Sequence, residues 1–222
     1  CALDLLVSPE NDGLAVAIEK ARSSRREGKL PTDETVRLLL TAGRYRLLEP
    51  IVLTPADSRL HFIGPEKGTA IIDGGVELPK FVVGANGVWE TKVPDGLAFN
   101  QLWVGGIRAQ RARIPNDGFL YMADCCEKYP TRAFYADLKD IAPVLALDPA
   151  DRDHVLVGHW ESWDMGYDQI ESLDSKTGHL VMRKGAMRKL FNGSIGRPRY
   201  VIENLRAALD APGEWFHDVK SG

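Results

Sequence analysis

A cluster of aromatic and polar residues near the middle of the chain has side chains that could bind a carbohydrate. Trp160 and Trp163 lie three residues apart, with His159 and Asp164 beside them. Flat indole rings stack on the C–H faces of pyranose rings, and the polar neighbours can hydrogen-bond hydroxyl groups. We therefore consider His159, Trp160 and Trp163 as candidate substrate-binding residues. The same residues could instead pack in the core of a small β module, and the sequence leaves this alternative open.

Three arginines, Arg108, Arg111 and Arg113, form a second candidate site. Arg111 and Arg113 are two residues apart, which places both side chains on one face of a strand. Guanidinium groups can bind the carboxylate of an acidic sugar through paired hydrogen bonds, and Arg113 is the candidate substrate ligand of this group. The alternative, which we favour, is that the arginines pair with the acidic segment that follows and fix its position.

The motifs of several other chemistries are missing from the sequence. There is no P-loop, dinucleotide fingerprint, Gly-x-Ser-x-Gly elbow or His-Glu-x-x-His motif. The five histidines are scattered, and the three cysteines, Cys1 and the adjacent Cys125 and Cys126, suit neither a zinc site nor a closed disulfide framework. We therefore expect no metal and no cofactor, with Cys125 and Cys126 reduced and packed as small apolar groups.

The overall composition is that of a globular chain. The 222 residues are 44% hydrophobic and 27% charged, and no apolar run approaches the roughly 20 residues that a membrane span needs. The 28 Lys and Arg residues against 31 Asp and Glu give a net charge of −3, so the positive field typical of nucleic-acid-binding proteins is lacking. We expect neither a nucleic-acid partner nor a membrane span.

The elements that must position these residues are predicted to be mainly β-strands. Apolar residues at helical spacing predict one amphipathic helix, from about Leu14 to Glu27, and Gly28 is its expected end. The rest of the chain predicts short strands separated by turn residues. They are Val36–Leu40, Ile51–Leu53, Leu60–Ile63, Ala70–Ile72, Phe81–Val83, Leu102–Val104, Val155–Val157, Tyr167–Leu173 and His179–Met182. Trp89 and Trp103 fall on β-like segments, and we expect both in a core.

The segments between the early strands are too short to contain a crossover helix. The strands must therefore either pair antiparallel, as in a β-sandwich, or stack about 4.8 Å apart as the rungs of a solenoid. The mostly apolar, weakly alternating strands favour a narrow solenoid interior, and the helix suits the cap that an open solenoid end requires. The composition alone does not exclude a sandwich.

Several segments of the first half resemble the opening rungs of right-handed parallel β-helix carbohydrate-active enzymes. They are Leu6-Val7-Ser8-Pro9 with the helix that follows it, Gly43-Arg44-Tyr45-Arg46-Leu47, Leu60-His61-Phe62-Ile63-Gly64 and Ile71-Ile72-Asp73-Gly74-Gly75. The resemblance implies a mostly β fold: the opening rungs of a right-handed parallel β-helix behind an N-terminal helical cap.

Later segments resemble, more specifically, the bacterial β-helix enzymes of glycoside hydrolase family 141. These segments are Arg111-Ala112-Arg113-Ile114-Pro115, His159-Trp160, Arg199-Tyr200 with Glu203-Asn204, and Pro212-Gly213-Glu214-Trp215. In that family a small β-barrel-like module is inserted between early rungs. Between Ile114 and Met182 the chain carries thirteen acidic residues against five basic ones, and the resemblance implies that this acidic segment is such an insert.

The sequence therefore predicts three parts. Residues 1–117 form the cap helix and the first β-helix rungs, residues 118–197 form the inserted small antiparallel β module, and residues 198–222 return to the β-helix. Within the returning part, Asn204 is expected to occupy a turn, because asparagine tolerates left-handed backbone and its amide can bond turn backbone groups.

Glycoside hydrolysis takes two carboxyl groups, about 5 to 5.5 Å apart for retention or about 6.5 to 9.5 Å apart for inversion. Glu203 and Glu214 are the catalytic candidates, because they lie in the stretch that most resembles the family. A structural role fits each of them too: Glu203 capping or pairing at a turn, and Glu214 anchoring the loop before the β-helix resumes. Members of the family continue well beyond the Pro-Gly-Glu-Trp segment, so the resemblance implies a catalytic pair beyond residue 222.

Together these features predict the N-terminal part of a carbohydrate-active β-helix protein, a glycoside hydrolase acting on a plant or algal polysaccharide. A polysaccharide lyase and a non-catalytic carbohydrate-binding or assembly module are the alternatives. The expected partners are a polysaccharide or oligosaccharide, and either a second copy or a second chain that completes the β-helix. The expected location is secreted, periplasmic or at the cell surface. A chain that begins at Cys1 also fits a lipoprotein anchored through that residue, or the edge of a longer sequence.

Overall fold

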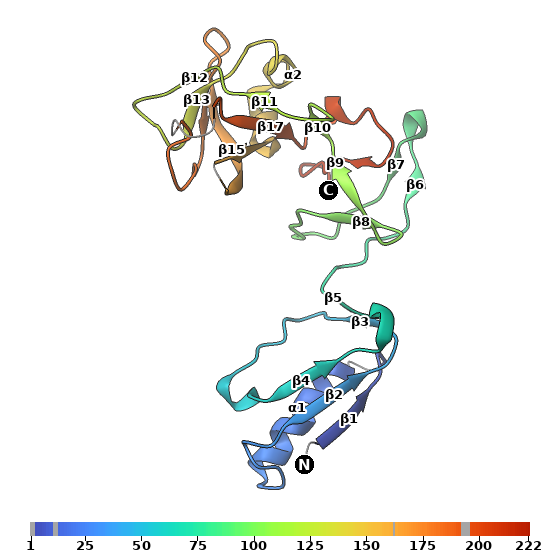
Figure 1. Cartoon of the computed structure of the whole chain (residues 1–222). Coiled ribbons are helices and arrows are strands. Elements are labelled where there is room, and N and C mark those ends of the chain that lie inside the picture. The colour runs from blue at the N-terminus through green and yellow to red at the C-terminus, as the bar shows by residue number, and fades with distance from the viewer. Residues whose placement is uncertain (1–2, 11–12, 162, 192–195) are drawn as a thin grey trace. The chain divides into compact units, whose positions relative to one another are not determined.

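The computed structural model describes residues 3–10, 13–161, 163–191 and 196–222 (Figure 1). Cys1, and with it the predicted lipid anchor, lies outside the described residues. The chain is mostly β, with few helices, and it divides into two compact units, Cys1–Thr91 and Lys92–Gly222. The predicted boundaries at residues 117 and 197 both fall inside the second unit and stay predictions.

The first unit contains parallel strand pairs beside one long helix (Figure 1). Three strands pair in the order β1-β2-β4, and two more pair as β3-β5, all of them parallel. A short antiparallel pair, β6-β7, ends the unit. The elements are β1 (Leu3–Val7), α1 (Gly13–Arg26), β2 (Val36–Leu40), β3 (Gly43–Arg46), β4 (Leu60–Ile63), β5 (Ala70–Asp73), β6 (Val82–Val83) and β7 (Trp89–Glu90).

The predicted amphipathic helix is confirmed as α1. Its buried side chains are Leu14, Ala17, Ile18 and Ala21, which share a core with Val7, Val36 and Leu38 of the adjacent strands. Burying a large aliphatic side chain contributes roughly 1.5 to 3 kcal/mol relative to leaving it exposed. The helix thereby covers the apolar residues of β1 and β2. These residues lie side by side because the two strands pair in parallel register.

An ion pair between the partly exposed Arg22 and the buried Asp57 fixes the end of the helix to a turn that follows the strands. Arg22 donates from Nε to Asp57 Oδ1 at 2.7 Å and from Nη2 to Oδ2 at 2.8 Å. The backbone amide of Thr54 also donates to Asp57, at 2.7 Å. These hydrogen bonds, with that of Arg22 the strongest, hold the pKa of Asp57 well below its usual range.

Two predictions for the strand-rich segments are wrong. The chain at Ile51–Leu53 forms no strand, because Pro50 and Pro55 on either side cannot donate to a β ladder. Trp89 and Trp103 are exposed rather than in a core. Trp89 lies on the short pair β6-β7, and Trp103 lies on the pair formed by β8 (Leu102–Val104) and β9 (Ile107–Arg111). The other residues of these pairs contribute nothing to the buried clusters among the described residues.

The second unit contains an antiparallel sheet of eight strands. Its order is β10-β17-β14-β15-β16-β13-β12, and β11 also pairs with β17. Its strands are β10 (Arg113–Ile114), β11 (Leu120–Tyr121), β12 (Asp124–Cys125), β13 (Ala133–Tyr135), β14 (Leu156–Trp160), β15 (Met165–Leu173), β16 (His179–Met182) and β17 (Arg199–Glu203). A short helix, α2 (Ala142–Leu145), lies between β13 and β14. The predicted strands from residue 155 to residue 182 are confirmed.

The core of this unit lies against the sheet. It includes the fully buried Phe134, Tyr200, Ile202 and Leu180, with the rings of Phe134 and Tyr200 5.0 Å apart. The alternating pattern of the strands explains this, because every second residue of an antiparallel strand points to the same face. Residues from before, within and after the predicted insert contribute to this one core.

A second, smaller sheet of this unit pairs two segments that are far apart in the sequence. It consists of β8 (Leu102–Val104), β9 (Ile107–Arg111) and β18 (Glu214–Trp215), in the order β18-β9-β8. Strand β18 runs parallel to β9, with Trp215 opposite Arg111. This pairing brings the arginine cluster of the sequence to the C-terminal segment.

Candidate functional site

The parallel pairing of β9 with β18 buries Arg111 beside aromatic and acidic side chains. The Arg111 side chain is 8% exposed, and its Nη1 lies 3.6 Å from Glu203 Oε2. Its guanidinium carbon lies 4.8 Å from the centre of the Trp215 ring, a cation–π distance. Burial lowers the pKa of Arg111 from its ordinary value, although the nearby Glu203 opposes this.

Arg111 is incompletely paired for a buried charge. Its Nε is buried and has no hydrogen-bond partner among the described residues. Its Nη2 reaches Asn100 Oδ1 only at 3.4 Å, and the contact with Glu203 is 3.6 Å. A buried guanidinium normally gains short, paired hydrogen bonds to offset the loss of water. The long contacts leave Arg111 able to bind a further acceptor.

Glu203, the carboxylate beside Arg111, is also buried. The Tyr167 hydroxyl donates a hydrogen bond to its Oε1 at 3.1 Å. Burial raises the pKa of Glu203, while this hydrogen bond and Arg111 act in the opposite direction. Burial and the neighbouring Glu203 raise the pKa of Tyr167 to about 12. Glu203, at the end of β17, therefore forms a packed polar cluster with Tyr167 and Arg111.

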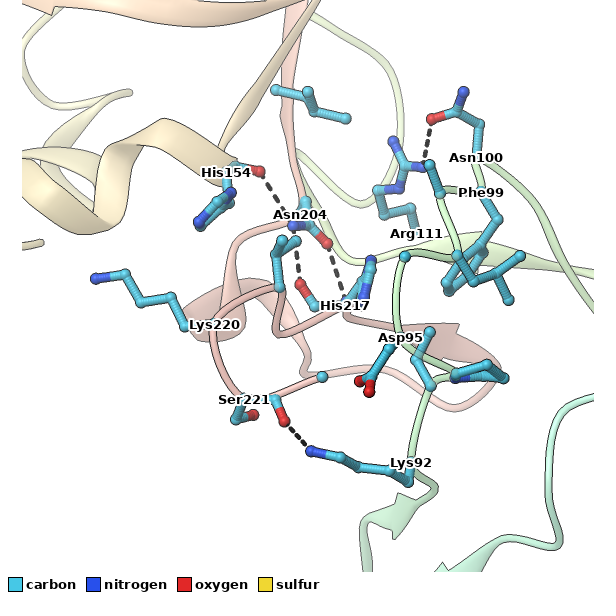
Figure 2. Close-up of a pocket in the computed structure, with 18 of the residues that line it drawn as sticks. Lys92, Asp95, Phe99, Asn100, Arg111, His154, Asn204, His217, Lys220 and Ser221 are labelled. Atoms are coloured by element: carbon cyan, nitrogen blue, oxygen red, sulfur yellow. Dashed lines mark hydrogen bonds between the residues drawn. The ribbon is translucent and has the colours of Figure 1, made fainter.

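Arg111 lines a cavity of about 710 Å³ in the second unit (Figure 2). Three groups of residues form its wall: the loop 92–100, the C-terminal residues 217 and 219–222, and side chains from the two sheets and the turn between them. The charged side chains of the described lining are Lys92, Asp95, Arg111 and Lys220. Its histidines are His154 and His217. Basic groups thus outnumber the single carboxylate.

Asn204 joins the parts of the chain that form the cavity wall. Its Nδ2 donates to the backbone carbonyls of His154 at 3.0 Å and His217 at 3.1 Å, and its Oδ1 accepts from the His217 amide at 3.0 Å (Figure 2). Its φ of 57° lies in the left-handed region. The predicted turn role of Asn204 is therefore confirmed. It links the 3₁₀ turn Pro149–His154, the end of β17 and the C-terminal segment.

An aromatic group forms another side of the cavity. The Phe99 ring stacks on Trp215 with centroids 5.2 Å apart and an interplanar angle of 19°. It also contacts the His217 ring, with centroids 4.8 Å apart. Burial, and then the charge of Arg111, lower the pKa of His217 below its ordinary value and so favour the neutral imidazole.

The predicted aromatic cluster lies elsewhere, on β14 and the turn after it. His159 is 3% exposed, and burial lowers its pKa. The Trp160 ring packs edge-on against Phe119 at 4.8 Å. Trp163 is 78% exposed, with the Arg188 guanidinium 4.5 Å from its ring centre, so the core alternative is wrong for Trp163. None of the three lines the cavity, and their role in substrate binding stays a prediction.

The other predicted site residues make mainly structural contacts. Glu214 Oε2 accepts hydrogen bonds from the backbone amides of Asp210 and Ala211, at 3.0 and 3.1 Å, and so closes the turn before β18. Arg113 donates to the backbone carbonyls of Pro115 and Gly118. It thus fixes the loop that begins the acidic segment through carbonyl groups rather than through acidic side chains. The catalytic roles of Glu203 and Glu214 stay predictions.

Cys125 and Cys126 are free thiols, and Cys126 packs in a small apolar cluster with Ala133 and Val181, as predicted. Across the described ranges, no three His, Cys, Asp or Glu side chains lie together as metal ligands would. Neither described α-helix combines the length and the apolar character needed to cross a bilayer.

Comparisons with known proteins give one finding about the fold. No family model and no curated protein matches the chain. A solved structure titled "Glycoside hydrolase" is similar, with a TM-score of 0.73 and 22% sequence identity. The match covers 99% of this chain and 42% of that one, so the chain spans less than half the length of the protein it resembles. This chain therefore has a glycoside hydrolase-like fold.

Proposed function

We propose that this chain is the N-terminal part of a carbohydrate-active protein, a glycoside hydrolase built on a right-handed parallel β-helix that acts on a plant or algal polysaccharide. The observation that carries the proposal is the likeness to a glycoside hydrolase over 99% of the chain. The parallel, in-register pairing of β1 with β2 and β4, and of β3 with β5, supports the opening rungs of such a helix.

The contribution of this part of the protein is ligand binding rather than the cleavage step. Glycoside hydrolysis takes two carboxyl groups facing the scissile bond. The described lining of the cavity contains one carboxylate, that of Asp95. Glu203 is committed to Tyr167 and Arg111, and Glu214 to backbone amides. We therefore place the catalytic pair of the proposed enzyme beyond residue 222.

The single carboxylate also favours a second candidate, a non-catalytic carbohydrate-binding or assembly module. A polysaccharide lyase is a further alternative, in which an arginine or lysine acts as base. These candidates differ in products. A hydrolase releases new reducing ends, a lyase releases unsaturated sugars that absorb ultraviolet light, and a binding module releases neither.

An assay of the 222-residue chain on a panel of plant and algal polysaccharides tests the proposal. We expect binding without turnover by this chain, and new reducing ends from a protein in which the chain is followed by further β-helix rungs. Ultraviolet-absorbing products would identify a lyase instead. Release of reducing ends by the 222-residue chain alone would contradict a catalytic pair located beyond it.

The proposed function carries a proposed location and proposed partners. A polysaccharide-degrading protein meets its substrate outside the cytoplasm, so we propose that the protein is secreted, periplasmic or at the cell surface. Its proposed ligand is a polysaccharide or oligosaccharide, and its proposed protein partner is a second copy or a second chain that extends the β-helix.

A further inference from the structure

We propose that the cavity of the second unit binds the acid group of a sugar, a carboxylate or a sulfate ester, with Arg111 and Lys92 as its cationic partners. This inference rests on the proposed function in one respect only, which is that the ligand is a carbohydrate. The charge of the ligand follows from the residues of the cavity itself.

Arg111 is the first of the two partners, because it is buried and lacks the acceptors that a buried guanidinium needs. Its side chain is 92% removed from solvent, since 8% of it is exposed. Its Nε is unpartnered, and its contacts with Asn100 and Glu203 are 3.4 and 3.6 Å long. An anionic oxygen in the cavity would supply a charge-assisted hydrogen bond that the protein does not.

Lys92 is the second partner. Its ammonium group donates to the backbone carbonyl of Ser221 across the cavity wall, which is a neutral acceptor, and no ion pair of Lys92 is found among the described residues (Figure 2). Lys220, the other lysine of the lining, is instead paired with Asp151. Arg111 is matched only by Glu203 at 3.6 Å, and the one carboxylate side chain of the described lining is that of Asp95. The two cationic groups at the cavity therefore lack short ion pairs among the described residues, and partial enclosure strengthens their attraction for an anion.

The remaining wall suits the body of a sugar. The volume of about 710 Å³ lies within the range of roughly 300 to 1,000 Å³ that is usual for small-ligand sites. Phe99 contributes apolar surface to the lining, and the amide of Asn100 can hydrogen-bond hydroxyl groups. The Asn204 hydrogen bonds fix the wall before the ligand arrives, which lowers the entropy cost of binding.

Titration calorimetry on the 222-residue chain tests the inference with three matched probes. They are a trigalacturonate, the same trisaccharide with its carboxyl groups reduced to alcohols, and a sulfated galactose oligosaccharide. We expect at least one acidic probe to bind roughly tenfold or more tightly than the reduced one, because a charge-assisted hydrogen bond is lost on reduction. The tighter of the two acidic probes identifies whether the acid group is a carboxylate or a sulfate.

Two exposed residues of the cavity give variants with opposite expected effects. Lys92→Gln removes a positive charge and should weaken binding of the acidic probe roughly tenfold, whereas Asp95→Asn removes the opposing charge and should strengthen it. Arg111→Lys keeps the charge but loses the planar fork, and should also weaken binding. Lys80→Gln, on an exposed loop of the first unit, is the matched control and should change nothing.

Three results would overturn the inference: equal binding of the acidic and reduced probes, no binding of any probe, or unchanged affinity in Lys92→Gln and Asp95→Asn. None of these results by itself contradicts the proposed function. A cavity that prefers neutral sugars would still be compatible with a carbohydrate-active protein. The release of reducing ends from a neutral polysaccharide is measured in a separate assay. Conversely, a protein with no polysaccharide activity could still bind the acidic probe.

Discussion

At the scale of single residues, two buried charged side chains, those of Asp57 and Arg111, differ in how completely they are paired. Asp57 of the first unit receives short hydrogen bonds from Arg22 and Thr54. Arg111 of the second unit has longer contacts and one unpartnered nitrogen. Complete pairing is what stability requires, because an unpaired buried charge is costly. Incomplete pairing in a cavity wall is what a ligand site requires.

The Asp57 pair predicts a pH-dependent contribution to stability. We expect Asp57→Ala to lower the free energy of unfolding by about 2 kcal/mol at pH 7, because the Arg22 and Thr54 donors lose their buried, charged acceptor. Since the folded protein lowers the pKa of Asp57, the contribution is complete above the unfolded carboxyl pKa of about 3.9. It declines as the pH falls below that value toward the folded pKa.

Urea unfolding of the wild type and the variant at pH 7 and pH 3 measures this effect. The difference between the two proteins should be smaller at pH 3. Asp4→Ala, which removes the exposed partner of Arg37, is the control and should change stability little. An equal loss at both pH values would contradict the role of the Asp57 charge.

At the scale of elements, sequence periodicity predicts the positions of most helices and strands. It is wrong where prolines flank an apolar run and where exposed tryptophans were expected in a core. The helix α1 and the strands β2, β4, β5, β15 and β16 lie where the sequence places them. Ile51–Leu53 has the composition of a strand, but prolines on both sides prevent regular pairing. The cavity wall depends on turns more than on strands, and Asn204 is the residue that joins them.

Asn204 gives a prediction about how these elements are joined. We expect Asn204→Ala to lower the free energy of unfolding by about 3 kcal/mol, because it loses three hydrogen bonds and places a less tolerant residue at a positive φ. Asn204→Gly keeps the backbone freedom and loses only the hydrogen bonds. Thermal unfolding should therefore rank the proteins wild type, Gly, then Ala. An Ala variant as stable as the wild type would show that the three bonds do not join the elements.

At the scale of the whole molecule, unpaired strand edges predict self-association. Strand β4 is the last strand of the β1-β2-β4 sheet, and β5 is the last described partner of β3. The large apolar side chains on these two strands, Phe62, Ile63, Ile71 and Ile72, are exposed. Unpaired backbone groups next to apolar side chains favour edge-to-edge pairing with another chain. A second copy, or a chain with further rungs, would cover them.

Light scattering across a range of protein concentrations measures this association. We expect the average mass to rise with concentration, and Ile71→Lys on β5 to reduce the rise by placing a charge at the edge. Val16→Lys, on the exposed side of α1, is the control and should leave the association unchanged. A monodisperse monomer at every concentration would contradict the prediction.

Some features of the candidate site were predictable from the sequence and others were not. Arg111 and Asn204 stand out by residue type and spacing, as one of two alternate arginines and as an asparagine at a turn. The structure ends β9 at Arg111 and begins β10 at Arg113, so the two arginines do not share the one strand that their spacing predicts. Lys92, Asp95, Phe99 and Lys220 lie in segments with no periodic pattern, separated by more than a hundred residues at the extremes. No local signal could have grouped them, because their proximity comes from non-local pairing.

The sequence by itself determined the mostly β character, the single long helix and the strands, because each depends on the periodicity of neighbouring residues. Only the tertiary structure decided that β18 pairs with β9, since a two-residue strand has too little pattern to specify a partner 100 residues away. That pairing buries Arg111 and brings the 92–100 loop to the C-terminal segment. The cavity therefore depends on long-range contacts, which no local pattern in the sequence predicts.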